Sequence, residues 1–229
     1  MPVVAASSPT DCFDAAYLAC KIALEHMTPV VLLTDAYIAN GSAAWRLPDL
    51  NTYPSICPPY VKPEMADSWT PFQRDPQTGV RYWATPGTPG FMHRIGGLEK
   101  SNETGAISTE PENHFLMTKL RAEKVEKIAD SLPPLTVEGD SDADLLIVGF
   151  GGTYGHLHSA MDQLNAMGKK TALAHFRVIN PLPKNTAEVL RKYKTIVVAE
   201  QNMGQLAGYL RMNCLLYTSP SPRDAHESR

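Results

Sequence analysis

Leu145-Leu-Ile-Val-Gly-Phe-Gly-Gly-Thr-Tyr-Gly155 is the segment that indicates the fold class most clearly. Its first six residues form an apolar run, which is typical of a strand covered on both faces in a parallel sheet. The glycines that follow predict a tight turn into a helix over 156–167. Further helical and strand patterns alternate along the rest of the chain, at 171–178, 184–193, 195–199 and after 205. This order predicts a small doubly wound α/β domain.

The amino-terminal part predicts a second, smaller α/β unit. Val3 to Ala6 is a buried-type strand, and 29–35 is another apolar strand pattern. Between them, Ser8-Pro-Thr-Asp11 predicts a helix start, with Ser8 as the cap and Asp11 completing an S-x-x-D box. Apolar residues then recur at helical spacing and predict the buried face, at Tyr17, Cys20, Leu24 and Met27. Strand, helix and strand in this order form a βαβ unit.

The middle of the chain predicts a long connection rather than a domain of its own. From Gly41 to Glu112, Pro and Gly are frequent and apolar periodicity is absent. Loops of this length are uncommon inside compact domains, so the segment is a functional excursion or an arm over a neighbour. A helix follows over 112–132, where Glu123 and Lys127 predict a supporting i,i+4 ion pair.

Composition bounds the function classes. The 229 residues carry a formal net charge of -3, and no basic run favours nucleic-acid binding by charge alone. Mean hydropathy is -0.22 and no apolar stretch reaches the length of a membrane span, so we expect a soluble, cytoplasmic chain. The four cysteines are far apart and predict no local zinc or iron–sulfur motif.

Both ends of the chain are unusual. Residues 214–229 begin Cys214-Leu-Leu-Tyr-Thr-Ser-Pro-Ser-Pro-Arg-Asp224, which resembles a translated sequencing adapter, and we exclude them from the predicted fold. The alternative is a genuine disordered tail. At the other end Met1 leads directly into a strand of the central type, so we expect the chain to be a piece of a longer protein.

Three polar segments are candidates for chemistry. The richest is 81–100, where Arg81 and Arg94 are able to bind a carboxylate or phosphate and His93 to exchange a proton. The alternative is a surface loop with solvated arginines. The glycine turn 149–155 predicts an anion site at a helix start or a tight structural turn or subunit contact, and Glu200 to Gln205 predicts an interface or the border of an active site.

Several motifs together resemble one family. The chain is similar to the alpha subunit of 2-oxoglutarate:ferredoxin oxidoreductase, within the 2-oxoacid:acceptor oxidoreductases. The motifs that carry the resemblance are Ala5-Ala-Ser-Ser-Pro-Thr-Asp-Cys-Phe-Asp-Ala-Ala16, Leu33-Thr-Asp-Ala-Tyr-Ile-Ala-Asn-Gly41, Thr85-Pro-Gly-Thr-Pro-Gly90, His93-Arg-Ile-Gly-Gly-Leu-Glu-Lys100, Phe176-Arg-Val-Ile-Asn-Pro-Leu-Pro183 and Val198-Ala-Glu-Gln-Asn-Met-Gly-Gln-Leu206.

The resemblance implies a domain plan. Residues 1–110 are the carboxy-terminal half of a thiamine diphosphate (pyrimidine-binding) domain with a long loop extension, and 111–134 is a linking helix. Residues 135–213 are a transketolase-C-terminal-like doubly wound domain. The family's Tyr-Pro-Ile-Thr-Pro segment and its glutamate for the aminopyrimidine have no counterpart in this sequence.

The resemblance also implies a reaction and its parts. The thiamine ylide adds to a 2-oxoacid, carbon dioxide leaves, electrons pass to ferredoxin and the acyl group passes to coenzyme A. Thiamine diphosphate and Mg²⁺ are expected at the interface with a beta subunit, in a hetero-oligomer whose iron–sulfur cluster is held by the partner. No membrane or nucleic-acid partner is expected.

The resemblance gives no catalytic residue and no metal ligand in this chain. For substrate binding it favours Arg81 and Arg94, with His93 and Thr88 as lesser candidates. The loop at the end of the first strand is expected to border the cofactor, through Ser8, Thr10 and Asp11.

Two other functions stay open at this point. In the first, the chain as it stands is a non-catalytic scaffold fragment. In the other it is a Rossmann-like nucleotide-binding domain, which binding of NAD by residues 135–213 would favour.

Overall fold

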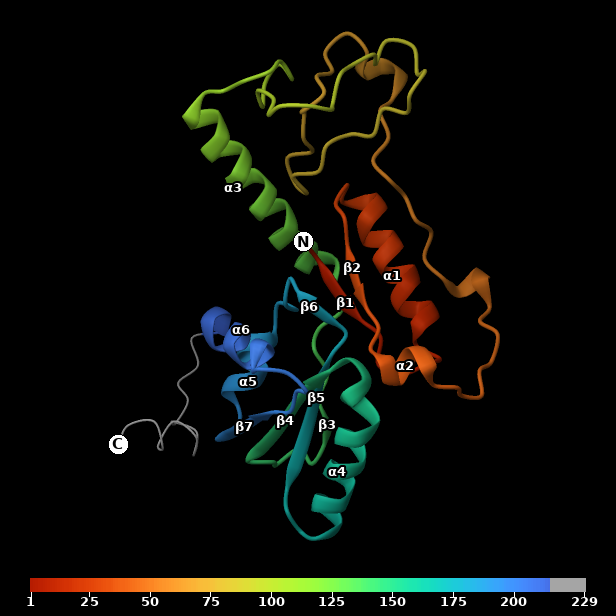
Figure 1. Ribbon diagram of the computed structural model, residues 1–229, viewed down its shortest axis with the longest axis vertical. Coiled ribbons are helices and arrows are strands. Elements are labelled where there is room, and N and C mark those ends of the chain that lie inside the picture. Colours follow the sequence, from red (N-terminus) through yellow and green to blue (C-terminus); the bar gives the residue numbers. More distant parts are fainter. Residues whose placement is uncertain (215–229) are drawn as a thin grey trace. The chain divides into compact units, whose positions relative to one another are not determined.

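A computed structural model describes residues 1–214, and the chain forms two compact units (Figure 1). The amino-terminal unit comprises Met1–Pro133 together with Arg177–Leu182, and the carboxy-terminal unit comprises Pro134–Phe176 and the residues from Pro183 onward. Of the predicted adapter segment 214–229, only Cys214 is described, as the last residue of a helix. Residues 215–229 lie outside the described part of the chain.

The amino-terminal unit is built on a three-stranded sheet. Strand β1 (Val3–Ala5) lies between β2 (Val31–Leu33), which is parallel to it, and β6 (Val178–Asn180), which is antiparallel. The predicted βαβ unit is therefore present. The third strand was not predicted, because the single strand predicted over 171–178 runs through Arg177, where the chain passes from one unit to the other.

Helix α1 (Cys12–Glu25) packs on this sheet, but with a different face from the one predicted. Its buried residues are Ala15, Ala19 and Ile22. Small side chains bring the helix close to the short strands, whereas the larger Tyr17 lies on a side that the long loop covers, and its hydroxyl donates to the Pro54 carbonyl at 2.6 Å. The predicted start is also displaced, since the Ser8 hydroxyl accepts from the Asp11 N–H but the α-helix begins at Cys12.

The long connection is largely irregular, as predicted. It follows the short α2 (Ala36–Asn40) and contains two 3₁₀ turns, Leu50–Thr52 and Pro63–Met65. Figure 1 shows it running from α2 past the opposite end of α1 before it reaches α3 (Pro111–Lys127). A 3₁₀ segment, Ile128–Ser131, then continues the helix.

Helix α3 is fixed to the amino-terminal unit at its carboxy-terminal end. Ile128 has no exposed surface and packs in the same apolar cluster as Val4, Ile22 and Val178. The predicted Glu123–Lys127 pair is wrong: Lys119 Nζ contacts Glu123 at 3.7 Å instead, and Lys127 Nζ donates to the Pro76 carbonyl. The long loop therefore draws Lys127 away from its helical neighbour.

The carboxy-terminal unit confirms the predicted doubly wound pattern. Its sheet has the order β3-β5-β4-β7, in which β4 (Leu145–Phe150), β5 (Thr171–Phe176) and β7 (Thr195–Val198) are parallel. The two-residue β3 (Glu138–Gly139) adds an antiparallel edge that was not predicted. Leu146, Val148 and Phe176 are fully buried, which agrees with strands covered on both faces.

Helices cover both faces of this sheet. The chain moves from β4 to β5 in one direction across the sheet and from β5 to β7 in the other, so right-handed connections place α4 (Tyr154–Ala166) and α5 (Thr186–Arg191) on opposite faces. Figure 1 shows α5 and α6 (Gln205–Cys214) together, away from α4. Among the described residues, no helix is both long and apolar enough to cross a membrane.

Candidate functional site

The loop that follows β1 is a closed network of its own hydrogen bonds. The Asp11 carboxylate is 8% exposed and accepts from the Ser7 N–H at 2.8 Å and the Ser7 hydroxyl at 2.9 Å. The Ser8 and Thr10 hydroxyls lie 3.0 Å apart and share a hydrogen bond. Asp11 therefore holds the loop in shape, and the half-buried Ser8 and Thr10 hydroxyls are what the loop offers to a ligand.

Arg177 is the residue of this loop network that sequence reasoning missed. It comes from the segment between β5 and β6, and its guanidinium donates to the Asp11 carboxylate. Its carbonyl also accepts the Ala5 N–H at 2.8 Å. No local pattern connects residues 166 positions apart, so only the sheet partnership of β1 and β6 reveals the pair.

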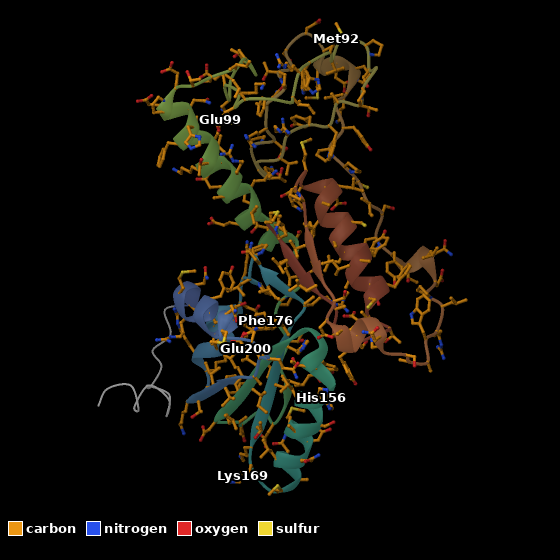
Figure 2. All side chains as sticks on the ribbon, in the orientation of Figure 1. Met92, Glu99, His156, Lys169, Phe176 and Glu200 are labelled. Carbon is orange, nitrogen blue, oxygen red and sulfur yellow. The ribbon has the colours of Figure 1, made fainter. Side chains whose placement is uncertain are left out.

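Three of the four predicted substrate-binding residues line one cavity. This cavity has a volume of about 1010 Å³ and is formed mostly by the segment 81–95 and the end of α1. Arg81, Thr88 and His93 are in its wall, whereas Arg94 is exposed and is not among the lining residues. Figure 2 shows Met92, which is 98% exposed, at the outer end of the long loop.

Arg81 is the charged residue of this cavity wall. Its guanidinium lies 4.6 Å from the centre of the Phe72 ring and donates to the Pro71 carbonyl at 3.4 Å. Burial lowers its pKa from the ordinary arginine value, although it stays protonated. Such a half-buried guanidinium over an aromatic ring keeps N–H groups for a carboxylate ligand.

The other two candidates in the wall are held by local contacts. The Thr88 hydroxyl donates to the Thr85 carbonyl at 2.7 Å, which closes a turn. His93 lies 2.7 Å from the Phe91 carbonyl through Nδ1, and its ring meets Trp69 edge-on at 4.9 Å. If Nδ1 carries the proton in this contact, Nε2 of the neutral ring is the atom left to accept a hydrogen bond.

The two predicted groups of site residues lie at opposite ends of α1. Asp11 precedes the first residue of the helix, and Leu24 and Met27, at its far end, line the cavity. A helix of 14 residues is roughly 20 Å long, so one small ligand held by this chain does not reach both groups. Figure 1 shows α2 and the outer part of the long loop at opposite ends of α1.

A second cavity, of about 700 Å³, shares Arg81 with the first. Its wall also contains Arg74, Arg121 and Lys124. Burial, followed by the charges of Arg74 and Arg81, lowers the Lys124 pKa to about 8. Sequence reasoning missed this group because its members come from separate segments. The one local signal was Arg121 and Lys124 at i,i+3 spacing on a helix.

The glycine turn of the carboxy-terminal unit is a packing feature. A Cβ atom at Gly149 would lie 2.3 Å from Leu157 Cδ1 and 2.8 Å from Thr153 Oγ1, so a side chain here would force Leu157 and Thr153 to move. Gly151 has a φ of +62°, a conformation that glycine adopts freely. Both observations favour the structural-turn interpretation.

The polar segment after β7 caps its own helix. Both Glu200 carboxylate oxygens accept backbone N–H groups at the start of α6, from Leu206 at 2.8 Å and Ala207 at 2.9 Å. Asn202 Oδ1 accepts the Gly204 N–H in the same way. The amino end of α6 is therefore already satisfied by carboxylate and amide oxygens.

Two family models match the chain, one in each part. Residues 1–112 match the model described as pyruvate flavodoxin/ferredoxin oxidoreductase, thiamine diphosphate-binding, and residues 143–221 match pyruvate:ferredoxin oxidoreductase core domain II. The 2-oxoglutarate oxidoreductase subunit KorA of Mycobacterium tuberculosis is 47% identical over 91% of this chain. The chain belongs to the 2-oxoacid:ferredoxin oxidoreductase family.

Other members of this family agree with that assignment. A 2-oxoacid:ferredoxin oxidoreductase subunit alpha of Aeropyrum pernix is 27% identical over 92% of the chain. Among solved structures, a 2-oxoglutarate:ferredoxin oxidoreductase from Magnetococcus marinus with 2-oxoglutarate, coenzyme A and succinyl-CoA bound matches 92% of the chain with a TM-score of 0.81 at 26% identity. The predicted family and fold class are thereby confirmed.

The matched region is only part of each relative. The chain spans 32% and 33% of the lengths of these two curated relatives, and 37% of the solved chain.

Proposed function

We propose that this chain is part of the alpha subunit of a 2-oxoacid:ferredoxin oxidoreductase that oxidises 2-oxoglutarate and forms an acyl-CoA product. The observation that carries the proposal is the cavity of the segment 81–95, where Arg81, Thr88 and His93 share one wall. The identity of 47% to a 2-oxoglutarate oxidoreductase subunit supports the choice of substrate.

The polar side chains that line this cavity suit a small dicarboxylate. Arg81 is the group that pairs with a carboxylate, because its N–H donors are partly shielded from water by Phe72 and Pro71. Thr88 and His93 add polar atoms to the same wall. We propose Arg94, exposed on the adjoining turn, as an outer contact that a partner subunit or substrate engages.

The described residues fit only part of a thiamine diphosphate site. The Asp11 carboxylate is taken up by Ser7 and Arg177, which leaves the Ser8 and Thr10 hydroxyls to contact a cofactor. Within residues 1–214 no group of three or more His, Cys, Asp or Glu side chains is arranged to hold a metal ion. The proposal therefore places the cofactor and Mg²⁺ against a beta subunit, and no chemical step is assigned to this chain's carboxylates.

The expected partners follow from the incomplete cofactor site of this chain. A beta subunit completes the cofactor site, an iron–sulfur cluster on a partner passes electrons to ferredoxin, and the assembly works in the cytoplasm. The separation of roughly 20 Å between the Asp11 loop and the cavity supports a site that needs more than this chain.

A chimera tests the proposed function. Residues 1–213 replace the aligned part of the Mycobacterium tuberculosis subunit, and the chimera is assembled with that enzyme's partner subunits. We expect viologen-dye reduction that requires 2-oxoglutarate and coenzyme A, and lower rates with pyruvate or a branched 2-oxoacid.

Two controls make the chimera assay decisive. Gel filtration establishes that the chimera assembles as the parent enzyme does, and omission of coenzyme A gives the background rate. An assembled chimera that reduces no dye with any 2-oxoacid would contradict the proposal. Activity with pyruvate alone would keep the reaction class and overturn the substrate.

A further inference from the structure

One short segment of the long loop supports two of the polar residues of the cavity proposed for the 2-oxoacid. The Trp69 ring meets the His93 ring nearly at right angles, with 4.9 Å between their centres. Three residues later, the Phe72 ring lies 4.6 Å from the Arg81 guanidinium carbon, and the Pro71 carbonyl accepts an Arg81 N–H at 3.4 Å. Trp69 and Phe72 are not among the residues that line this cavity, so any effect they have on a ligand goes through their neighbours.

Trp69 packs against both residues that flank an exposed methionine. Met92 is 98% exposed at the outer end of the long loop, as Figure 2 shows, whereas Phe91 is 4% exposed. The Trp69 ring meets Phe91 edge-on as well, with 5.3 Å between the ring centres. The Phe91 carbonyl lies 2.7 Å from His93 Nδ1, so the imidazole is held both at one nitrogen and across its ring. Loss of Trp69 would therefore free the His93 ring on one side.

The segment itself is built from tight turns. The Trp69 N–H donates to the Met65 carbonyl at 2.9 Å. The Gln73 N–H donates to the Thr70 carbonyl at 3.0 Å, which closes the next turn. These hydrogen bonds fix the spacing between the Trp69 and Phe72 rings.

The same segment pairs with the part of the chain around Arg81. Arg74 and Arg81 form an antiparallel bridge. Beside it, the Asp75 N–H donates to the Val80 carbonyl at 2.8 Å, and Val80 is 1% exposed, so a buried side chain anchors the pairing. The two rings therefore belong to one leg of a hairpin-like turn and Arg81 to the other, which couples the positions of Arg81 and His93.

We propose that Trp69 is a positioning residue of the 2-oxoacid site, which orients the His93 imidazole toward the substrate at a fixed distance from the Arg81 guanidinium. This inference rests on the proposed function, because it needs the substrate contacts of His93 and Arg81. It goes further by giving a role in the reaction to a residue that does not line the cavity.

Replacements of Trp69 in the chimera of the proposed function test this role. Trp69→Leu removes the ring, and kcat/KM for 2-oxoglutarate should fall roughly three- to tenfold, the usual effect of losing an aromatic pair. Trp69→Phe should restore most of the rate, because it keeps a ring and the indole N–H makes no hydrogen bond within the described residues. Trp45→Leu is the matched control, since Trp45 is also on the long loop and meets Phe13 at 5.9 Å but does not line the cavity. This control should leave kcat/KM unchanged.

A double-mutant cycle with His93→Gln separates positioning from a structural role. If Trp69 acts through His93, addition of Trp69→Leu to His93→Gln should lower kcat/KM no further. A structural tryptophan would lower it by the same factor in both backgrounds. That result would overturn the proposal, as would a loss in Trp69→Leu no larger than in Trp45→Leu, or an unchanged kcat/KM in His93→Gln. If Trp69→Leu does not assemble, the cycle uses Trp69→Met, whose flexible side chain fills more of the space.

Nuclear magnetic resonance of the full chain tests the contact without turnover. The His93 imidazole C–H signals are assigned by their absence from His93→Gln. They should move in Trp69→Leu, which removes the ring current of the indole, and keep their positions in Trp45→Leu. Unmoved signals would overturn the positioning role even in an active chimera. A chimera that assembles but turns over no 2-oxoacid would instead overturn the proposed function, and with it the substrate contact of His93, whatever the signals show.

Discussion

Replacement of Asp11 by alanine should destabilise the amino-terminal unit by about 2–3 kcal/mol. The nearly buried carboxylate accepts two hydrogen bonds from Ser7 and one from Arg177. The two Ser7 bonds come from one residue and are lost together, so we count them as one contact to a charged group, worth roughly 1.5–3 kcal/mol. The Arg177 side chain is 49% exposed, so water competes for its contact with Asp11. We therefore expect the Arg177–Asp11 pair to contribute about 1 kcal/mol or less to the stability.

Urea unfolding followed by circular dichroism measures this loss. The double-mutant cycle of Asp11→Ala with Arg177→Gln should give a coupling energy of about 1 kcal/mol, because the two residues share one contact. Asp67→Ala is the control, since Asp67 is exposed in the same unit, and it should change the free energy of unfolding by less than about 0.5 kcal/mol.

A loss of unfolding free energy in Asp11→Ala no larger than in the control would contradict the structural role of the Asp11 carboxylate. A cycle that shows no coupling would also contradict it, because the loop would then hold its shape without the carboxylate. Either result would return Asp11 to the set of side chains open to a cofactor, beside Ser8 and Thr10.

Three further predictions concern the core, the glycine turn and the second cavity. Ile128→Ala should cost about 2–5 kcal/mol in urea unfolding, because the side chain is fully buried where α3 meets the sheet; a loss under about 1 kcal/mol would count against that anchor. Gly149→Ala should cost about 1–3 kcal/mol in thermal unfolding, since the new Cβ would overlap Leu157; an unchanged midpoint would mean that the strand and helix separate readily. The Lys124 pKa is about 8 in the folded chain and ordinarily 10.5, so the unfolded chain binds more protons between these values. The free energy of unfolding should therefore contain a contribution that rises from pH 8 to about 10, and Lys124→Gln should remove it.

Local patterns were sufficient for the parallel strands and the helices of the carboxy-terminal unit, but not for its short edge strand β3. The apolar run Leu145–Phe150 predicted its central strand because every residue of that strand meets a covered face. Local patterns did not predict β6 (Val178–Asn180), because it directly follows β5 and was partly included in the strand predicted over 171–178. Its partner strand, β1, is at the other end of the sequence. Strand pairing over that distance leaves no periodic signal in either segment.

The buried face of α1 was predicted wrongly for a related reason. Helical spacing identifies apolar faces but not which of two is covered by a sheet and which by a loop. Tyr17 has a larger side chain than Ala15, yet the small side chains of Ala15 and Ala19 allow α1 to approach the sheet closely. The loop that covers Tyr17 has no periodic pattern that reveals where it passes.

The candidate site was predictable in part. The density of glycine and polar residues at 81–100 identified the segment that forms the first cavity, and Arg81, Thr88 and His93 line it. The second cavity was not predictable, because Arg74 and Lys124 meet only through the fold of the long loop onto α3. A cluster of positively charged residues from distant segments is recognised only in the folded structure.

The most direct test of the proposed function compares Arg81→Gln with the parent in the assembled chimera. We predict a fall in kcat/KM for 2-oxoglutarate of roughly 10- to 100-fold, the effect of losing a charge-assisted contact to a carboxylate, while the exposed Lys62→Gln leaves it unchanged. Turnover of 2-oxoglutarate by Arg81→Gln at the parent's kcat/KM would contradict the assignment of this cavity to the 2-oxoacid.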